Sequence, residues 1–292
     1  MEISVSKLSK KRLGDWVVNP YVGCEHGCKH CYCPAMPGVM FFNEGHTQQE
    51  WGEYLFPKKD WIERLTKEVR KFPREGSKAG KGYIRCSFLT DCYTPAEAKY
   101  MLTRQTLEIL LEKGCKVRVQ TRSALVERDF DLLVKHKSQV LLGTSLPYLD
   151  DRLSRILEPK ATAPSRRLEM LRKAKAAGLD VYVAVAPFMP LHGVSELTEV
   201  INAVKELKPV EIFCEVLNPR AENLAMMNDA LATAGRPERI DAEYQERWAR
   251  YTHSMLTTVA AECERAGVGD SLIAWPDLKA AKSKKLTETE RA

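Results

Sequence analysis

Nine cysteines occur in the 292-residue chain, and four of them lie between positions 24 and 33. Three form the pattern Cys24-Glu-His-Gly-Cys28-Lys-His-Cys31. Three thiolates on one short loop can each bind one iron of a [4Fe-4S] cubane, which leaves the fourth iron without a protein ligand. Gly23 and Gly27 favour such a loop, because glycine adopts unusual backbone conformations at little cost. The spacing therefore predicts a cluster with one open coordination site.

The same cysteines allow a second interpretation, a structural zinc site in which Cys33 supplies a fourth thiolate. Zinc ribbons and fingers usually present two separated cysteine pairs, whereas this loop holds three ligands within eight residues. The uneven placement of the cysteines also argues against a disulfide scaffold. We expect Cys24, Cys28 and Cys31 to bind the cluster, with Cys33 as a packed or surface thiol.

Strand-like and helix-like segments alternate along the chain. The strand candidates are apolar, β-branched or aromatic enough for a buried strand. They are residues 16–18, 83–88, 116–120, 140–145, 179–186 and 210–217. Apolar stripes typical of amphipathic helices occupy residues 60–72, 103–113 and 195–207. Because this alternation requires parallel strands with right-handed crossovers, the sequence predicts an α/β fold, a partial parallel (β/α)6 TIM-like barrel.

The C-terminal part of the chain predicts a helical extension and a tail. Residues 241–266 place Tyr244, Trp248, Tyr251, Met255 and Val259 on one side of a long helix, which we expect to pack outside the barrel. Residues 279–292 are charged and nearly free of large apolar side chains, so they predict a mobile tail. We therefore expect one domain over residues 1–278, followed by the tail over 279–292.

Polar side chains lie at or just beyond the ends of four apolar strand segments: Asp91, Arg122, Ser145 and Glu215. The carboxyl ends of parallel barrel strands meet at one face, so these side chains are expected to point into the mouth of the barrel. Each also has a structural interpretation. Arg122 and Glu215 can form ordinary ion pairs, Ser145 can simply end its strand, and Asp91 can order its own loop through backbone hydrogen bonds.

The three-cysteine loop and the run of βα units that follows resemble the radical S-adenosylmethionine (SAM) superfamily. Further stretches resemble its spore photoproduct lyase branch, and together they span about residues 19–220. They are Asn19-Pro-Tyr-Val-Gly-Cys24, Leu89-Thr-Asp-Cys-Tyr-Thr-Pro, Glu158-Pro-Lys-Ala-Thr-Ala-Pro-Ser-Arg-Arg-Leu168 and Val185-Ala-Pro-Phe-Met-Pro190. The cysteine motif is specific for the superfamily, whereas the other stretches point only to a branch with mixed activities.

The resemblance implies that a [4Fe-4S] cluster and SAM are the cofactors, with the amino and carboxylate groups of SAM on the open iron. It also implies a 5′-deoxyadenosyl radical and a one-electron reductant such as flavodoxin or ferredoxin. Arg122 matches a lysine that contacts the SAM carboxylate in the lyase, and Ser145 matches a hydroxyl near the same cofactor. His30 stands where the superfamily usually has an aromatic side chain against adenine. Asp91 and Glu215 complete the predicted cofactor-binding set.

One position departs from the lyase pattern. In spore photoproduct lyase a cysteine near the end of the second strand returns a hydrogen atom to the product, and Phe88 occupies the matching position here. Cys86, two residues earlier, and Cys92, in the following loop, are candidate replacements. Plain packing is the other interpretation of a buried cysteine. Tyr54 is a further catalytic candidate, as a phenolic relay, and so is Tyr93.

Composition limits the class of protein. With 44% hydrophobic and 29% charged residues, the chain is typical of a globular protein. No apolar run approaches the roughly 20 residues of a membrane span, and the N-terminus lacks the apolar core of a signal peptide. The sequence therefore predicts a cytoplasmic protein that does not enter a membrane.

The charge balance bears on the substrate. Forty-five basic and 39 acidic side chains give a net charge of +6, which permits but does not require binding to a polyanion. Three hypotheses follow: radical repair or modification of nucleic acid, radical modification of a peptide or small metabolite, and a non-catalytic iron-sulfur or zinc protein. The lyase resemblance and the basic balance favour the first.

Overall fold

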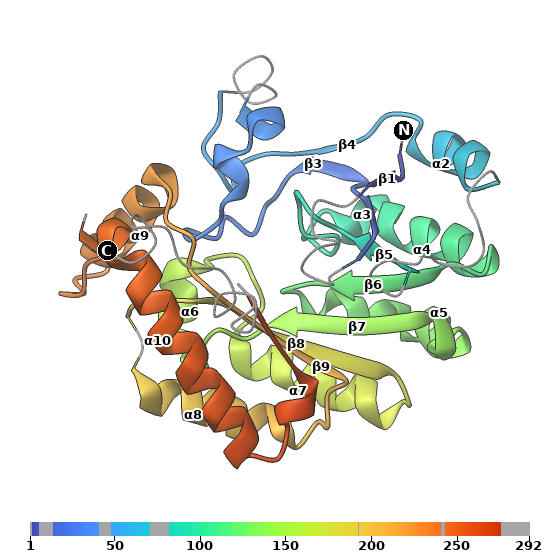
Figure 1. The fold of residues 1–292 in the computed structure, drawn as a ribbon. Helices are drawn as coiled ribbons and strands as arrows, with labels where there is room; N and C mark the ends of the chain where they lie inside the picture. Colours follow the sequence, from blue (N-terminus) through green and yellow to red (C-terminus); the bar gives the residue numbers. More distant parts are fainter. Residues whose placement is uncertain are drawn as a thin grey trace.

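The computed structural model describes residues 2–5, 14–40, 48–70, 82–191, 193–240 and 243–275. A curved sheet of eight strands, in the order β1-β2-β5-β6-β7-β8-β9-β10, forms its centre (Figure 1). β1 pairs antiparallel with β2, and the other neighbouring strands run parallel. The strands are β1 Ser4–Val5, β2 Trp16–Val18, β5 Tyr83–Cys86, β6 Lys116–Gln120, β7 Val140–Ser145, β8 Asp180–Phe188, β9 Glu211–Val216 and β10 Leu272–Trp275.

Helices cover the outer face of the sheet (Figure 1). The α-helices are α2 Trp61–Val69, α3 Glu97–Tyr100, α4 Leu102–Glu112, α5 Phe130–Lys135, α6 Asp151–Leu157, α7 Pro164–Ala176, α8 Val194–Lys205, α9 Ala221–Thr233 and α10 Glu243–Arg265. Short 3-10 helices are η2 Cys33–Ala35, η4 Ala124–Asp129, η5 Lys137–Gln139 and η6 Gly269–Ser271. Among the described helices, none is long and apolar enough to cross a membrane.

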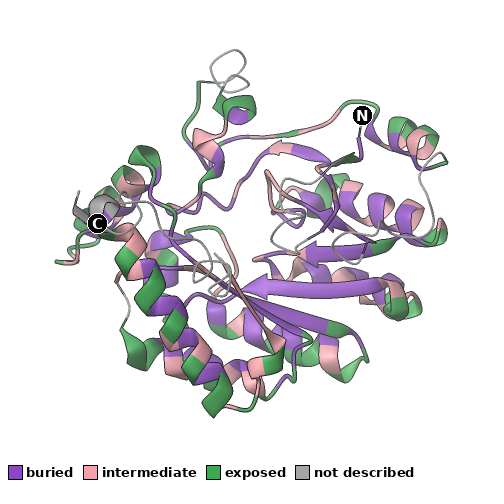
Figure 2. Cartoon of the chain, viewed as in Figure 1, coloured by how far each residue is buried: buried purple, intermediate pink, exposed green. Residues whose placement is uncertain are grey.

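The main core lies between the sheet and its helices. All six residues of β7 are buried, as expected for a parallel strand that is covered on both faces. α8 turns Leu197, Val200, Ile201 and Val204 inward. Figure 2 shows the same division, with buried residues along the strands and exposed residues on the outer helix faces.

The prediction of a partial parallel barrel with a C-terminal helix is confirmed. β2, β6 and β7 have the predicted bounds, and α10 contacts α8, β9 and β10 on the outside of the barrel. β10 was not predicted; it is a seventh parallel strand beside β9, and its four half-buried residues are too few to stand out in the sequence. The tail predicted over residues 279–292 lies outside the described residues.

The two strands of a small second sheet flank the cysteine loop in the sequence. β3 (Tyr21–Gly23) pairs antiparallel with β4 (Leu55–Pro57), and Figure 1 shows both strands beside the barrel rather than in it. Gly23 has a φ of +86°, and a Cβ atom there would lie 2.5 Å from the ring of Tyr54. Only glycine fits this close approach. The sequence thus fixes the direction in which the chain enters the cysteine loop.

Candidate active site

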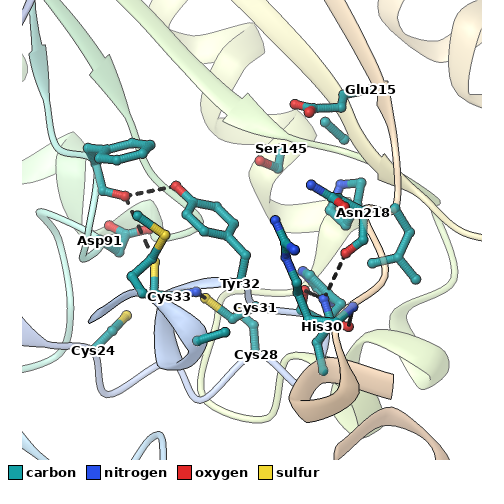
Figure 3. Close-up of a pocket in the computed structure, with 18 of the residues that line it drawn as sticks. Cys24, Cys28, His30, Cys31, Tyr32, Cys33, Asp91, Ser145, Glu215 and Asn218 are labelled. Atoms are coloured by element: carbon teal, nitrogen blue, oxygen red, sulfur yellow. Dashed lines mark hydrogen bonds between the residues drawn. The ribbon is translucent and has the colours of Figure 1, made fainter. Parts of the chain in front are cut away.

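A cavity of about 800 Å³ lies at the carboxyl ends of the parallel strands. The cysteine loop, the ends of β5, β6, β7 and β9 and the beginning of α9 contribute to its wall (Figure 3). The residues predicted to bind the cluster or SAM all line this one cavity. They are Cys24, Cys28, His30, Cys31, Asp91, Arg122, Ser145 and Glu215.

Of the three cysteines of the motif, Cys24 and Cys28 are buried and Cys31 is half-buried, which suits a donor set for a cluster. Cys24 is 7% exposed and Cys28 6%. Burial raises the pKa of the Cys24 thiol, and Asp91 and Cys28 raise it further. Burial also raises the pKa of Cys28, although Arg122 opposes this, while a hydrogen bond to Cys33 and burial raise the pKa of Cys31. Thiolates gathered in such a site need cations to compensate them, and the irons of a cluster supply these.

Cys33 also lines the cavity, beside Cys31. Its backbone N–H donates to Cys31 Sγ at 3.4 Å, and its own Sγ lies 3.9 Å from the carbonyl oxygen of Phe88. Thiolates around a single zinc ion lie about 3.8 Å from one another. Within the described ranges, no group of three or more His, Cys, Asp or Glu side chains is arranged to hold a metal ion. A cubane would bind each of three thiolates through a different iron, whereas a zinc site would gather four thiolates around one ion.

Arg122 follows β6 and lies between the cysteine loop and a buried carboxylate. Its Nε is 3.3 Å from Glu158 Oε1, and its Nη2 is 3.3 Å from His30 Nε2. Glu158 also pairs with the buried Arg167. Burial opposes ionisation of Glu158, but Arg167, Arg122 and His30 together lower its pKa to about 2. Burial and Arg122 lower the pKa of His30 to about 3, so its imidazole is neutral at pH 7.

Asp91 orders the loops around the cavity. Its Oδ1 accepts hydrogen bonds from the Tyr93 N–H at 2.9 Å and the Thr121 hydroxyl at 2.6 Å, and its Oδ2 accepts from the Arg122 N–H at 2.7 Å. His26 Nδ1 is 3.4 Å from the same oxygen. Burial opposes ionisation, but His26 and these hydrogen bonds lower the pKa of Asp91 to about 2. The carboxylate thus ties the loop after β5 to the end of β6 and to the cysteine loop.

Polar side chains from successive strands form the floor of the cavity. Gln120 on β6 donates from Nε2 to Ser145 Oγ on β7 at 2.9 Å. Arg85 on β5 donates to the amide oxygen of Gln120 and, through Nε, to the carbonyl oxygen of Ser87 at 3.0 Å. Glu215 lines the cavity from β9. This arrangement offers fixed hydrogen-bonding groups at the base of a cavity whose rim carries the cysteine loop.

Residues 18–205 match the family model of the radical SAM superfamily. The chain belongs to the radical SAM superfamily. It is therefore an enzyme of a family whose members use SAM together with a [4Fe-4S] cluster.

Two related proteins are similar to this chain over most of their length. The uncharacterized protein ORF301 of Acidianus two-tailed virus is 33% identical over 254 residues, which cover 84% of this chain and 81% of that protein. The uncharacterized protein MJ0683 of Methanocaldococcus jannaschii is 29% identical over 208 residues, which cover 70% and 71% of the two chains. Neither name indicates a reaction.

Among solved structures, mutants of spore photoproduct lyase share the fold. One superimposes with a TM-score of 0.67 at 14% identity, over 94% of this chain and 78% of that chain. Another, with bound AdoMet and dinucleoside spore photoproduct, has a TM-score of 0.64. At this identity the likeness shows a common architecture for this radical SAM enzyme and the lyase.

Three residues predicted to be catalytic are not among those that line the cavity. Cys86 and Cys92 are fully buried in the core, and Cys92 Sγ lies 3.3 Å from the carbonyl oxygen of Cys86. Tyr54 packs edge-on against Trp51, with 5.9 Å between the ring centroids, beside the cysteine loop. Burial and the Cys33 and Cys31 thiols raise the pKa of Tyr54. Catalytic roles for these residues stay predictions.

Other cavity residues were not recognised in the sequence. Tyr32 is 39% exposed, lines the cavity, and donates its hydroxyl to the Phe88 carbonyl oxygen at 3.0 Å. Its position directly after Cys31 is a signal that could have identified it. Arg85 and Gln120 also line the cavity. For Gln120 the signal is the alternation along β6, which places residues 118 and 120 on one face.

Proposed function

We propose that this radical SAM enzyme holds a [4Fe-4S] cluster through Cys24, Cys28 and Cys31, binds SAM in the adjoining cavity, and modifies a nucleic-acid substrate. The observation that carries the proposal is the convergence of the three cysteines with the predicted SAM-binding side chains on one cavity. Together, a bound cluster and SAM supply a 5′-deoxyadenosyl radical that abstracts a hydrogen atom from a substrate. A one-electron reductant such as flavodoxin or ferredoxin is the partner that this chemistry needs.

The side chains around the cavity suit SAM. Arg122 offers a guanidinium for the carboxylate, and the Ser145 hydroxyl offers a further hydrogen bond. His30, neutral because of its lowered pKa, can lie flat against adenine as a planar ring. Glu215 also lines the cavity, from β9. His30 and Ser145 are buried and Arg122 and Glu215 are half-buried, so a group bound among them is largely shielded from water and held in a fixed position.

Two side chains at the cavity support a nucleic-acid substrate. Tyr32 presents an exposed aromatic ring, on which a base can stack. Arg220, which precedes α9, is exposed and lines the cavity, where a guanidinium can pair with a phosphate. The net charge of +6 and the fold shared with a lyase whose solved structure has a bound dinucleoside spore photoproduct point the same way.

The cluster proposal is tested by anaerobic reconstitution. Cys24→Ala, Cys28→Ala and Cys31→Ala should each lose the cluster, because three thiolates are needed to hold it. Cys33→Ala should retain about four irons per chain, the content of one cubane. Wild type and Cys33→Ala should then form 5′-deoxyadenosine from SAM in the presence of a reductant. Loss of iron in Cys33→Ala alone would show that the ligand set is wrong.

The substrate proposal is tested by oligonucleotide binding. A protein that contacts several phosphates loses affinity steeply as salt rises, because counterions are released on binding. Arg220→Glu should weaken binding and flatten this salt dependence. Lys116→Glu is the matched control, since Lys116 is exposed at the opposite end of β6. Absence of oligonucleotide binding at low salt would contradict the proposal and favour radical modification of a peptide or small metabolite.

A further inference from the structure

Gln120 is held in one orientation on the cavity floor. A guanidinium only donates hydrogen bonds, so the atom of Gln120 that contacts Arg85 must be the amide oxygen. The hydroxyl of Tyr182 donates to the same oxygen at 3.1 Å. The amide nitrogen therefore points the other way, to Ser145 Oγ at 2.9 Å. Two independent donors fix the orientation of this amide.

The amide orientation determines what Ser145 can do. Because Gln120 donates to Ser145 Oγ, the serine oxygen acts as an acceptor in that contact. A hydroxyl has one hydrogen of its own to donate. The backbone carbonyl of Ser145 is held in turn by Arg167 Nη1 at 2.7 Å, so the residue as a whole is fixed. Ser145 lines the cavity, as Figure 3 shows, so its hydroxyl hydrogen can be donated to a group bound on that side.

The layer beneath Gln120 keeps this arrangement rigid. Arg118 lies 3.7 Å from the centroid of the Tyr182 ring and pairs with Glu211. On the neighbouring strand, a Cβ atom at Gly143 would lie 2.3 Å from the Tyr182 ring, so glycine leaves the space that the ring occupies. The hydroxyl of Tyr182 is thus held beneath the amide oxygen of Gln120. A preorganised donor of this kind loses little freedom when a ligand binds.

We propose that Gln120 is a positioning residue that commits the Ser145 hydroxyl to donate a hydrogen bond to the carboxylate of SAM. The inference rests on the proposed function, in which SAM occupies this cavity. An ionised carboxylate only accepts hydrogen bonds. Ser145 and the cationic Arg122 line the same cavity, and each can donate a hydrogen bond to such a group.

The test is Gln120→Glu, which nearly preserves the shape of the side chain. A carboxylate at position 120 still accepts from Arg85 and Tyr182, but it also accepts the hydrogen of Ser145. The serine then turns a lone pair toward the cavity. Hydrogen bonds to charged groups contribute enough that SAM binding to the reconstituted protein should weaken about 10- to 100-fold. Gln120→Met, which leaves the hydroxyl free to rotate, should weaken it by only about threefold.

A double-mutant cycle separates the hydroxyl from the added charge. Ser145→Ala removes the group through which Gln120 is proposed to act, so the penalty of Gln120→Glu should shrink about tenfold or more in that background. Gln105→Glu, on α4 and outside the cavity lining, is the control for net charge and should bind SAM like the wild type. Equal penalties of Gln120→Glu in the two backgrounds would overturn the proposal.

A second ligand, 5′-methylthioadenosine, shows which part of SAM Ser145 contacts, because it lacks the amino and carboxylate groups of the methionine portion. Gln120→Glu should leave its affinity unchanged, and equal losses for both ligands would overturn the assignment to the carboxylate. Iron content and the thermal transition are measured for each variant, since a folding defect lowers both. If the reconstituted wild type fails to bind SAM, the proposed function is wrong; if it binds SAM and Gln120→Glu binds equally well, the role of Gln120 is wrong.

Discussion

Two arginines at the same strand of the barrel have opposite surroundings. Arg118 within β6 is 1% exposed, stacks on Tyr182 and pairs with Glu211 across the barrel. Arg122, four residues later, lines the cavity with a side chain that is 21% exposed and pairs with Glu158. The Arg118–Glu211 pair, called here the lower pair, is enclosed by the barrel. The Arg122–Glu158 pair, called the upper pair, borders a cavity large enough for a ligand. The comparison shows that depth along the barrel, rather than residue type, separates a structural arginine from a site arginine.

The two pairs also differ in charge balance. In the lower layer one guanidinium faces one carboxylate. In the upper layer Glu158 faces two guanidinium groups, those of Arg122 and Arg167, while His30 is neutral. Within this cluster two guanidinium groups share one carboxylate beside the cysteine loop. Such an arrangement suits a site that receives anionic groups, because a second carboxylate can complete the pairing of Arg122.

The largest expected effect comes from breaking the lower pair. Arg118→Met leaves Glu211 buried without the guanidinium that now contacts it, and removing one partner of a buried pair typically costs about 3–5 kcal/mol. The free energy of unfolding, measured by urea denaturation, should fall by about this amount. A double variant, Arg118→Met with Glu211→Gln, should recover part of the loss. An unchanged unfolding midpoint in Arg118→Met would show that the lower pair does not stabilise the barrel.

The upper pair should show itself in the pH dependence of stability. The pKa of Glu158, about 2 in the folded protein, lies below its ordinary value. The contribution of ionised Glu158 to the free energy of unfolding is therefore fully present above about pH 4.5 and is lost as the pH falls toward 2. The loss is on the order of 3 kcal/mol. Urea denaturation between pH 2 and 6 measures it. Asp91 also has a pKa of about 2, so some acid sensitivity should persist in Glu158→Gln. Identical pH profiles of the wild type and Glu158→Gln would contradict this prediction.

Removing the upper arginine should affect the ligand more than the fold. In Arg122→Met, Glu158 keeps its partner Arg167, so the free energy of unfolding should change by less than about 1 kcal/mol. SAM binding to the reconstituted protein should weaken about tenfold or more, because a charged hydrogen-bond donor is lost. Equilibrium dialysis with SAM and iron analysis measure the two properties separately. Unchanged SAM affinity would remove Arg122 from the site.

Most of the fold could be predicted from the sequence, because the buried strands of a parallel sheet are rich in apolar and β-branched residues. β6 and β7 were predicted with their observed bounds. Helices α7 and α9 were missed for a physical reason. Their sequences, PSRRLEMLRKAKA and AENLAMMNDALAT, contain many charged or small residues, so neither shows a clear apolar stripe. Such helices form because the barrel covers one of their faces, which is a tertiary effect.

The candidate site was partly predictable for the same reason. The rule that strand ends converge placed Asp91, Arg122 and Ser145 together, and the structure puts them on one cavity. The rule does not say which face of a strand turns inward. In β5, Arg85 faces the cavity, whereas its neighbour Cys86 is buried in the core between the sheet and its helices. A difference of one position along a strand therefore decides whether a side chain lines the cavity or packs in the core.

The smallest expected effect concerns the link between the two layers. Tyr182 stacks on Arg118 below and donates its hydroxyl to Gln120 above, so Tyr182→Phe removes the hydroxyl and its contacts but keeps the stacked ring. One hydrogen bond is worth about 1 kcal/mol, and the free energy of unfolding should fall by about that amount because the stacked ring remains. Arg85 still fixes the amide of Gln120, so SAM affinity should fall by no more than about threefold. Calorimetric titration with SAM and urea denaturation test both figures. A loss of SAM binding as large as that in Arg122→Met, at unchanged stability, would mean that the lower layer belongs to the site and that the division between the two arginines is wrong.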